Sequence, residues 1–299
     1  MRTGLADLHR HLDGSVRPAT LSALAEAAGV TVPEDLCFTP GMGLHAALSR
    51  FAFTLSLLQD PDTVARVAHE ICEDAASEGV STLEIRFAPQ LHRGGTIPMI
   101  VDAALEGIAG RAGLLLCALY GEPPPIAHAL LDAAIPRQGV VGIDLAGGPA
   151  PGHTWGMADL SDAFARARSH GLGRTVHAGE GRDAAEIRVA IEHLHAQRIG
   201  HGLTVLDDPE LTALVRDRGI TLEACPTSNW QVGIISEIAA HPLPQWLEQG
   251  LSVCINTDNT LLSGVDAPEE SRRAEAIPGV GPSGIARAHR FGHAAAFSR

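Results

Sequence analysis

The chain has 299 residues, among them 15 histidines, and its 35 acidic and 22 basic side chains give a net charge of −13. It contains no lysine, which excludes Schiff-base enzymes, P-loop phosphate sites and barrel hydrolases that bridge two metals with a carbamylated lysine. The negative net charge argues against nucleic acid or an anionic membrane as a partner.

Short apolar segments alternate with longer amphipathic segments along the chain. We expect eight strands, at Leu5–His9, Thr82–Phe87, Leu114–Leu119, Val140–Leu145, Arg174–His177, Arg198–Gly200, Thr221–Ala224 and Ser252–Asn256. Helical periodicity lies between most of them, for example at Thr63–Ala76, Met157–His170, Ala184–His195 and Asp208–Asp217. This order predicts an α/β fold, a closed (β/α)8 TIM barrel, and the length fits one barrel domain over residues 1–299.

One insertion departs from this alternation. Residues 17–60 follow the first strand and carry two extra helical patterns, Leu21–Ala28 and Leu44–Leu58. An insertion at this point lies next to the carboxyl end of the first strand. We therefore expect a helical lid over the mouth of the barrel.

The tail after Ser263 is polar and contains one helix-like stretch at Ile285–Phe297. His289 and His293 are one helical turn apart in that stretch, and we expect them at the surface. The five cysteines are scattered, and neither a signal peptide nor a membrane-spanning apolar run is evident. We expect a cytoplasmic protein, and the sequence does not indicate an oligomeric state.

Metal-ligating residue types stand where several predicted strands end. His9 and His11 are two residues apart, so in a strand both imidazoles point to the same face. His177, His201 and Asp258 follow the fifth, sixth and eighth strands, and the carboxyl ends of barrel strands form one rim. Histidine nitrogen and carboxylate oxygen ligands with one water suit zinc. The sequence therefore predicts a metal site on this rim.

Two further residues suit proton transfer beside that site. Glu180 lies three residues after His177, just past the fifth strand, where a carboxyl group can donate a proton. The alternative is a glutamate that stabilises the start of the next helix. His201 stands between Gly200 and Gly202, and its spacing fits either a metal ligand or a second base.

Three residues near the same rim suit substrate binding. Gly147 follows the fourth strand, where a small residue allows a flat ligand to approach the backbone, although a tight turn explains it equally well. Asp13 follows the histidine pair and either contacts a ligand or starts the next turn. Asn259 follows Asp258 and offers an amide that donates to a ring nitrogen at any pH.

Taken together, the motifs resemble the adenosine deaminase family, metal-dependent purine nucleoside deaminases of the amidohydrolase superfamily. The resemblance covers about residues 5–264 and rests on seven segments in the order of the family. These are Leu8-His9-Arg10-His11-Leu12-Asp13-Gly14, Leu83-Glu84-Ile85-Arg86-Phe87-Ala88-Pro89, Gly142-Ile143-Asp144-Leu145-Ala146-Gly147, Thr175-Val176-His177-Ala178-Gly179-Glu180, Arg198-Ile199-Gly200-His201-Gly202, Cys225-Pro226-Thr227-Ser228-Asn229 and Asn256-Thr257-Asp258-Asn259.

This resemblance implies one Zn²⁺ per chain and a purine as the small-molecule partner. The implied zinc ligands are His9, His11, His177 and Asp258. Glu180 would protonate the purine N1, His201 would orient the attacking water, and Asp258 would accept from that water.

The resemblance also implies how the substrate is held. Gly147 would donate its N–H to N3 and Asn259 would bind N7. His11 and Asp13 would contact the substrate, with Asp13 at the 5′ end of the ribose.

The implied reaction is zinc-dependent hydrolytic deamination of a 6-aminopurine nucleoside. Adenosine or 2′-deoxyadenosine would give inosine or 2′-deoxyinosine and ammonia. Adenine, aminodeoxyfutalosine or a biosynthetic nucleoside are alternative substrates, and a non-catalytic ligand-binding relative is an alternative of another class. Three departures from the family leave the substrate open. The third βα segment is shorter than usual, since Cys117-Ala118-Leu119-Tyr120 runs directly into Gly121, Gly148 replaces a common aspartate, and the part after Gly264 is short and matches poorly.

Overall fold

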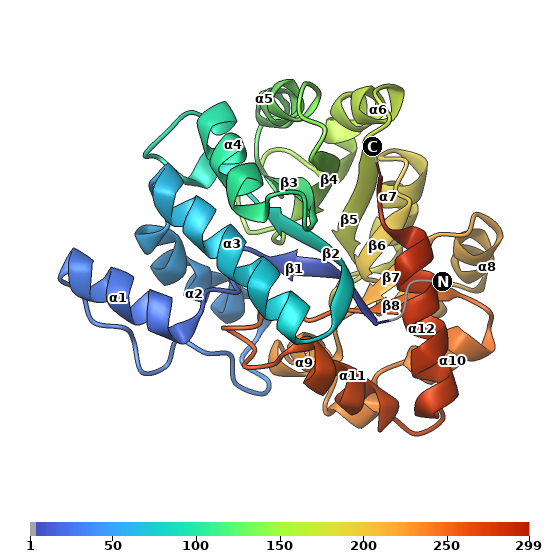
Figure 1. Cartoon of the computed structure of the whole chain (residues 1–299). Coiled ribbons are helices and arrows are strands. Elements are labelled where there is room, and N and C mark those ends of the chain that lie inside the picture. The colour runs from blue at the N-terminus through green and yellow to red at the C-terminus, as the bar shows by residue number, and fades with distance from the viewer. Residues whose placement is uncertain (1–3, 299) are drawn as a thin grey trace.

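The computed structural model describes residues 4–298, and eight parallel strands form a barrel at its centre (Figure 1). The strands are β1 (Leu5–His11), β2 (Val80–Phe87), β3 (Gly113–Leu119), β4 (Val140–Ala146), β5 (Gly173–Ala178), β6 (Arg198–His201), β7 (Thr221–Ala224) and β8 (Ser252–Ile255). They pair in chain order, and a parallel bridge between Arg10 and Asp258 brings β8 back to β1. The predicted (β/α)8 barrel is confirmed.

Helices surround the strands on the outside of the barrel (Figure 1). They are α1 (Pro18–Ala28), α2 (Leu44–Leu57), α3 (Pro61–Ser77), α4 (Ile97–Ile108), α5 (Pro124–Ala134), α6 (Ser161–Ser169), α7 (Ala184–Glu192), α8 (Pro209–Asp217), α9 (Pro226–Gln231), α10 (Leu243–Glu248), α11 (Ala267–Glu275) and α12 (Gly281–Ala295). Within residues 4–298, no helix is both long enough and apolar enough to cross a bilayer.

Local sequence sets where several of these helices begin. The side chains of Asp60, Asp208 and Asp266 each accept a hydrogen bond from the first turn of the helix that follows. A proline stands in the first turn of each of these helices, where its missing N–H leaves no hydrogen bond unmade. These signals fix the starts of α3, α8 and α11.

The strands are covered on both faces, which explains their near-continuous apolar sequences. β4 is buried along its whole length, and Asp144 is its one charged residue. β1 continues two residues beyond its predicted end, so that His9 and His11 both belong to the strand. Charged side chains inside buried strands are costly unless they are paired, so Asp144 indicates a site.

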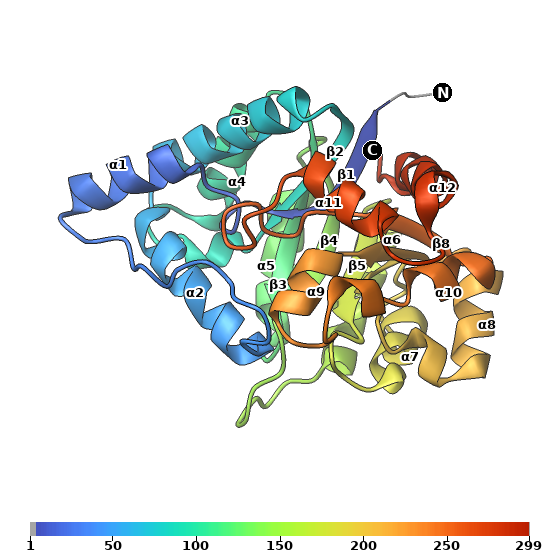
Figure 2. The same cartoon turned by 90° about the horizontal axis from the view of Figure 1, so that it is seen from below.

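The insertion forms the two helices expected of it. Helices α1 and α2 lie between β1 and α3, to one side of the barrel (Figure 2). The side chains of Leu48, Phe51 and Leu55 on α2 line a cavity at the carboxyl ends of the strands. Helix α2 therefore occupies the position predicted for a lid.

The predicted surface position is wrong for His289, which is 9 % exposed. Its Nδ1 accepts a hydrogen bond from the N–H of Ala6 at 3.3 Å, and its Nε2 lies 3.0 Å from the hydroxyl of Ser271. His293 is partly exposed, with its Nε2 3.1 Å from the carbonyl oxygen of Gly4. These three contacts arise because α12 packs against α11, β8 and β1, beside the amino end of β1 (Figure 2).

Candidate metal centre and active site

Four predicted side chains converge at the carboxyl ends of β1, β5 and β8. The Nε2 atom of His11 lies 3.2 Å from Nε2 of His9 and 3.2 Å from Nε2 of His177. An Oδ1 atom of Asp258 lies 3.4 Å from Nε2 of His11 and 3.6 Å from Nε2 of His9. Tetrahedral zinc with bonds of about 2.0–2.1 Å separates its ligand atoms by roughly 3.3 Å. The four groups therefore have the spacing of a zinc ligand set.

Hydrogen bonds to carboxylates fix the protonation of two of these imidazoles. Nδ1 of His9 lies 2.7 Å from Glu223, and Nδ1 of His177 lies 3.2 Å from Asp144. A carboxylate only accepts, so each Nδ1 carries the proton and each Nε2 presents a lone pair. Burial lowers the pKa of His9 well below its ordinary value, which also keeps this ring neutral. The pKa of His177 is raised, because its pairing with Asp144 outweighs its burial. A cation bound by these Nε2 lone pairs would therefore compete with a proton at His177.

A buried arginine connects the two carboxylates behind these histidines. Arg86 donates to Asp144 at 2.8 Å and to Glu223 at 2.9 Å, and all three side chains are fully buried. Glu223 also forms an ion pair with Arg198, whose Nε lies 2.7 Å from its Oε1. Arg86 therefore holds the two carboxylates in position to accept from the imidazoles.

Glu180 reaches the same point from the end of β5. It is 5 % exposed, and its Oε1 lies 3.5 Å from Nε2 of His201. Burial raises its pKa to about 7, because the charged form is poorly solvated there. A carboxyl group with this pKa holds a proton near neutral pH and can donate it.

His201 adopts a left-handed backbone conformation, with a φ of 65°. The side chain of Asn229, on α9, lies with its amide nitrogen 3.0 Å from Nδ1 of His201. The amide donates to Nδ1, so the proton of the neutral ring sits on Nε2. The nitrogens of His9, His177 and His201 all lie within 4.8 Å of one another, which places His201 beside the ligand set.

The remaining candidates surround this centre. Asn259 is 3 % exposed and lies over Gly14, where a Cβ atom would stand 1.9 Å from the amide oxygen of Asn259. Gly147 has a φ of 74°, a conformation that side chains other than glycine rarely adopt. Asp13 is buried, and its Oδ1 has no hydrogen-bond partner among the described residues.

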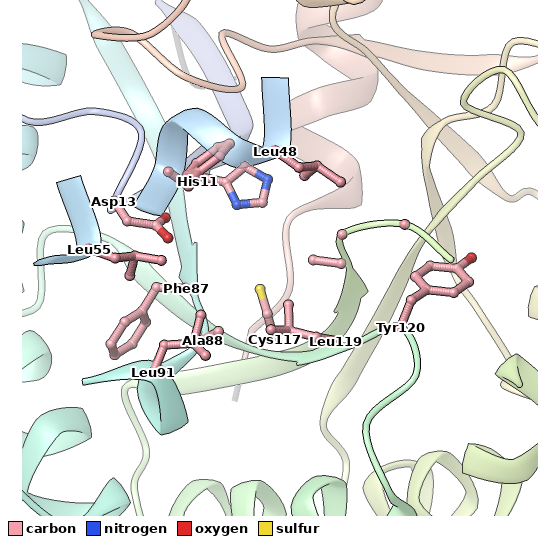
Figure 3. Close-up of a pocket in the computed structure, with 14 residues that line it drawn as sticks. His11, Asp13, Leu48, Leu55, Phe87, Ala88, Leu91, Cys117, Leu119 and Tyr120 are labelled. Atoms are coloured by element: carbon pink, nitrogen blue, oxygen red, sulfur yellow. The ribbon is translucent and has the colours of Figure 1, made fainter. Parts of the chain in front are cut away.

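Two adjoining chambers open at this rim. The chamber beside the metal ligands, about 370 Å³, is lined by polar and apolar residues. They include His177, Glu180, His201, Asp258 and Asn259, and also Phe38, Leu44, Ala47 and Val232. The apolar chamber, about 780 Å³, is lined by Asp13, Leu48, Leu55, Phe87, Ala88, Leu91, Cys117, Leu119, Tyr120, Ala146 and Gly148 (Figure 3). Both chambers are lined by His11, Leu48, Phe51 and Gly147. The structure thus brings the predicted site residues other than His9 to the lining of two adjoining chambers, and His9 is fully buried behind His11.

The family model for adenosine deaminase matches residues 4–299. The chain belongs to the adenosine deaminase family. Members of this family are metal-dependent enzymes that remove an amino group from cyclic amidines by hydrolysis. The match also corrects one expectation, because it continues through the tail after Gly264, where α11 and α12 complete the fold.

Relatives within the adenosine deaminase family are similar over most of their length. The adenosine deaminase of Enterococcus faecalis is 36% identical over 285 residues, which cover 88% of this chain and 83% of the relative. The adenosine deaminase of Mycobacterium ulcerans is 36% identical over 317 residues, covering 94% and 86%.

Solved structures give the same architecture. The adenine deaminase of Arthrobacter aurescens has a TM-score of 0.89 at 26% identity, covering 100% of this chain and 95% of its own. The N6-mAMP deaminase of Arabidopsis has a TM-score of 0.88 at 26% identity, covering 99% and 94%. Proteins of this fold therefore act on different 6-aminopurines, and the lining of the cavity has to distinguish them.

Sequence reasoning missed three residues of this site. Asp144 and Glu223 support the metal-binding histidines, and Asn229 orients His201. The signal for the first two was a single carboxylate within each buried strand, β4 and β7. Asn229 gave no signal beyond its place in a family motif, since its contact with His201 joins two separate elements.

Proposed function

We propose that the protein is a zinc-dependent deaminase of a 6-aminopurine nucleoside, converting adenosine or 2′-deoxyadenosine to inosine or 2′-deoxyinosine with release of ammonia. The observation that carries this proposal is the ligand set of His9, His11, His177 and Asp258, with contacts of 3.2–3.6 Å, beside the buried acid Glu180. The chamber lined by His177, Glu180 and Asp258 has no lysine or arginine in its lining.

These four side chains would hold one zinc ion. Zinc bound there would supply a Lewis acid and a water that ionises near neutral pH. His201 is better placed beside the ion than on it, because its Nε2 carries the proton and offers no lone pair. Its Nε2–H would stabilise the negative charge that develops on the oxygen added to C6.

The protein's own groups would complete the reaction. Glu180, protonated in its buried position, would donate to N1 and make C6 electrophilic, and the C6–N bond would then break as ammonia leaves. Asp258 would accept a proton from the attacking water. The N–H of Gly147 would bind N3, and the amide of Asn259 would donate to N7.

The nucleoside is our preferred substrate because Asp13, in the lining of the adjoining apolar chamber, would lie beyond the purine in the proposed placement. Its unpartnered Oδ1 offers an acceptor for a sugar hydroxyl, with His11 beside it on the chamber wall. Adenine, the substrate named for the Arthrobacter aurescens relative, lacks the sugar that this carboxylate would bind. Adenine and other aminopurines are the alternatives that the experiment has to separate.

Zinc content and ammonia release from a substrate panel test the proposal. We expect about one zinc per chain and ammonia from adenosine and 2′-deoxyadenosine. Faster turnover of adenine would change the substrate class but not the chemistry. Purified protein that binds zinc and purine but releases no ammonia would indicate a non-catalytic relative and overturn the proposal.

A further inference from the structure

A buried carboxyl group that the proposed reaction does not use lies beside α9. Glu270 on α11 is 1 % exposed, although glutamate is rarely buried unless it has a partner. Burial raises its pKa to about 7, so placing this carboxylate inside the protein costs free energy. Its hydrogen bonds show what the carboxylate holds in place.

Both oxygens of Glu270 bind Thr227, in the first turn of α9. Oε1 accepts from the backbone N–H of Thr227 at 2.9 Å, and Oε2 accepts from its hydroxyl. Arg273 donates to the same hydroxyl at 3.2 Å, which leaves the hydroxyl proton for Glu270. Helices α9 and α11 lie side by side in both views of the molecule (Figure 1 and Figure 2). The contact therefore joins two neighbouring helices.

Helix α9 lacks the groups that usually fix the start of a helix. It has only six residues, its N-cap Cys225 makes no side-chain hydrogen bond to it, and Pro226 has no N–H. Thr227 supplies the first N–H of the helix, and without Glu270 this buried N–H would lose its partner. A helix this short is not stable through its own hydrogen bonds. The carboxylate from α11 thus provides the cap that the sequence of α9 does not.

The position of α9 matters because this helix carries the side chain that orients His201. Asn229, two residues after Thr227, donates to Nδ1 of His201 at 3.0 Å and leaves the ring proton on Nε2. In the proposed reaction this Nε2–H stabilises the negative charge that develops on the oxygen added to C6. Movement of α9 would displace Asn229, and His201 would then lose the hydrogen bond that selects its tautomer.

We propose that Glu270 is a positioning residue of the deaminase reaction, which acts through Thr227 and Asn229 to keep His201 in its Nε2–H form. This inference rests on the proposed function, in which His201 stabilises the transition state. The groups proposed to bind the purine, Gly147 and Asn259, lie on other segments of the chain. Loss of Glu270 should therefore lower kcat and leave KM nearly unchanged.

Steady-state kinetics of the zinc-loaded full chain test the proposal, with adenosine or, should it be the better substrate, adenine. Glu270→Leu removes both acceptors, and we expect kcat to fall about tenfold or more while KM changes less than about twofold. Glu270→Gln keeps an oxygen for the N–H of Thr227 and should recover most of the wild-type kcat. Glu275→Gln is the matched control, because Glu275 is exposed on the same helix, and it should have the kcat of the wild type. Rates are expressed per folded, zinc-loaded chain, so that a loss of folded protein is not counted as a slower reaction.

A double-mutant cycle tests the route through Asn229. In the Asn229→Ala background, Glu270→Leu should lower kcat by no more than about threefold, because the side chain that it positions is already absent. Thr227→Val removes only the hydroxyl contact and repeats the test by a milder change, should Glu270→Leu fold poorly. Equal factors in the two backgrounds would overturn the proposal and show that Glu270 only stabilises the fold.

The tautomer of His201 provides a readout that does not depend on activity. In protein labelled with ¹⁵N in histidine, the imidazole signals of His201 are identified by their loss in His201→Gln. We expect the Nε2–H tautomer in the wild type and in Glu275→Gln, and a mixture of the two neutral forms in Glu270→Leu. An unchanged tautomer in Glu270→Leu would contradict the proposal.

The outcomes separate this inference from the function on which it rests. If the wild type releases no ammonia from any aminopurine of the panel, the proposed function fails, and the inference fails with it. If the wild type is active and Glu270→Leu keeps both its kcat and its His201 tautomer, the deaminase stands and the inference alone is overturned.

Discussion

At the scale of single residues, the site contains backbone conformations that cost free energy. His201 and Asp258 have φ values of 65° and 61°, in the left-handed region that favours glycine. Such conformations cost on the order of 1–3 kcal/mol each and persist only where the surroundings enforce them. Asp258 is held by backbone hydrogen bonds with β1, from its N–H to His9 and from His11 to its carbonyl oxygen, both at 2.8 Å. These two hydrogen bonds with β1 thus orient Asp258 so that its carboxylate lies next to His9 and His11.

Gly14 is expected to be necessary for the position of Asn259. In Gly14→Ala, the new Cβ would stand 1.9 Å from the amide oxygen of Asn259 and 2.7 Å from its Cγ. The amide has to move, so we expect kcat/KM for adenosine to fall about 10- to 100-fold, as small displacements in a site do. Gly156→Ala is the control, because its Cβ would meet only Asp159 at 3.8 Å. Equal activity of the two variants would contradict a binding role for Asn259.

Glu180 is expected to act in its protonated form. Its pKa of about 7 means that the protonated fraction falls as the pH rises through 7, and kcat/KM should fall on that alkaline side. Glu180→Gln cannot release a proton, so activity should drop about 10²–10⁴-fold and lose this alkaline limb. Thermal stability and metal content of the variant should match the wild type. A Gln variant with a wild-type rate would exclude Glu180 as the acid.

At the scale of elements, one ionic network connects strands on different sides of the barrel. Arg86 on β2 pairs with Asp144 on β4 and Glu223 on β7, and these two carboxylates orient His177 on β5 and His9 on β1. The network lies inside the barrel, where unpaired charge is costly. The same contacts therefore serve the fold and the metal ligands.

Removal of the arginine should cost stability as well as metal affinity. Arg86→Met leaves the buried Asp144 without its arginine and Glu223 with Arg198 alone, and we expect the free energy of unfolding to fall by about 3–5 kcal/mol. Arg137→Met is the matched control, because Arg137 pairs with Asp102 near the surface, where such pairs contribute about 0–1 kcal/mol. Chemical denaturation of both variants measures the difference. Similar losses in the two would show that the buried network contributes little.

At the scale of the whole molecule, the metal ligands come from β1, β5 and β8, which lie far apart in the sequence but share one rim. A ligand that binds only the folded state stabilises it according to its concentration and affinity. Zinc is therefore expected to stabilise the closed barrel.

Chelation tests this expectation. Removal of zinc should lower Tm by several degrees and abolish ammonia release, and added zinc should restore both. In His177→Ala, which removes one ligand, the chelator should shift Tm less than in the wild type. Wild-type Tm insensitive to chelation would argue against a metal bound by these strands.

The sequence by itself determined the eight strands and the helical insertion, and it predicted that the candidate site residues share one rim. Period-two and helical patterns depend on local residue order, and a parallel barrel places all strand ends on one rim, so His9, His177, His201 and Asp258 were predictable together. The packing of α12 could not be predicted in the same way. His289 was expected at the surface but is buried, because its burial depends on how α12 packs against β8 and β1.

Only the tertiary structure decided which side chains hydrogen-bond to the histidines of the site and which side chains line the cavity. The contacts of Glu223 with His9 and of Asn229 with His201 join residues that are 214 and 28 positions apart. The apolar chamber is likewise formed by side chains from α2 and the ends of several strands. Hydrogen bonds and cavity walls depend on distances in space, and the order of residues along the chain does not specify those distances until the barrel closes.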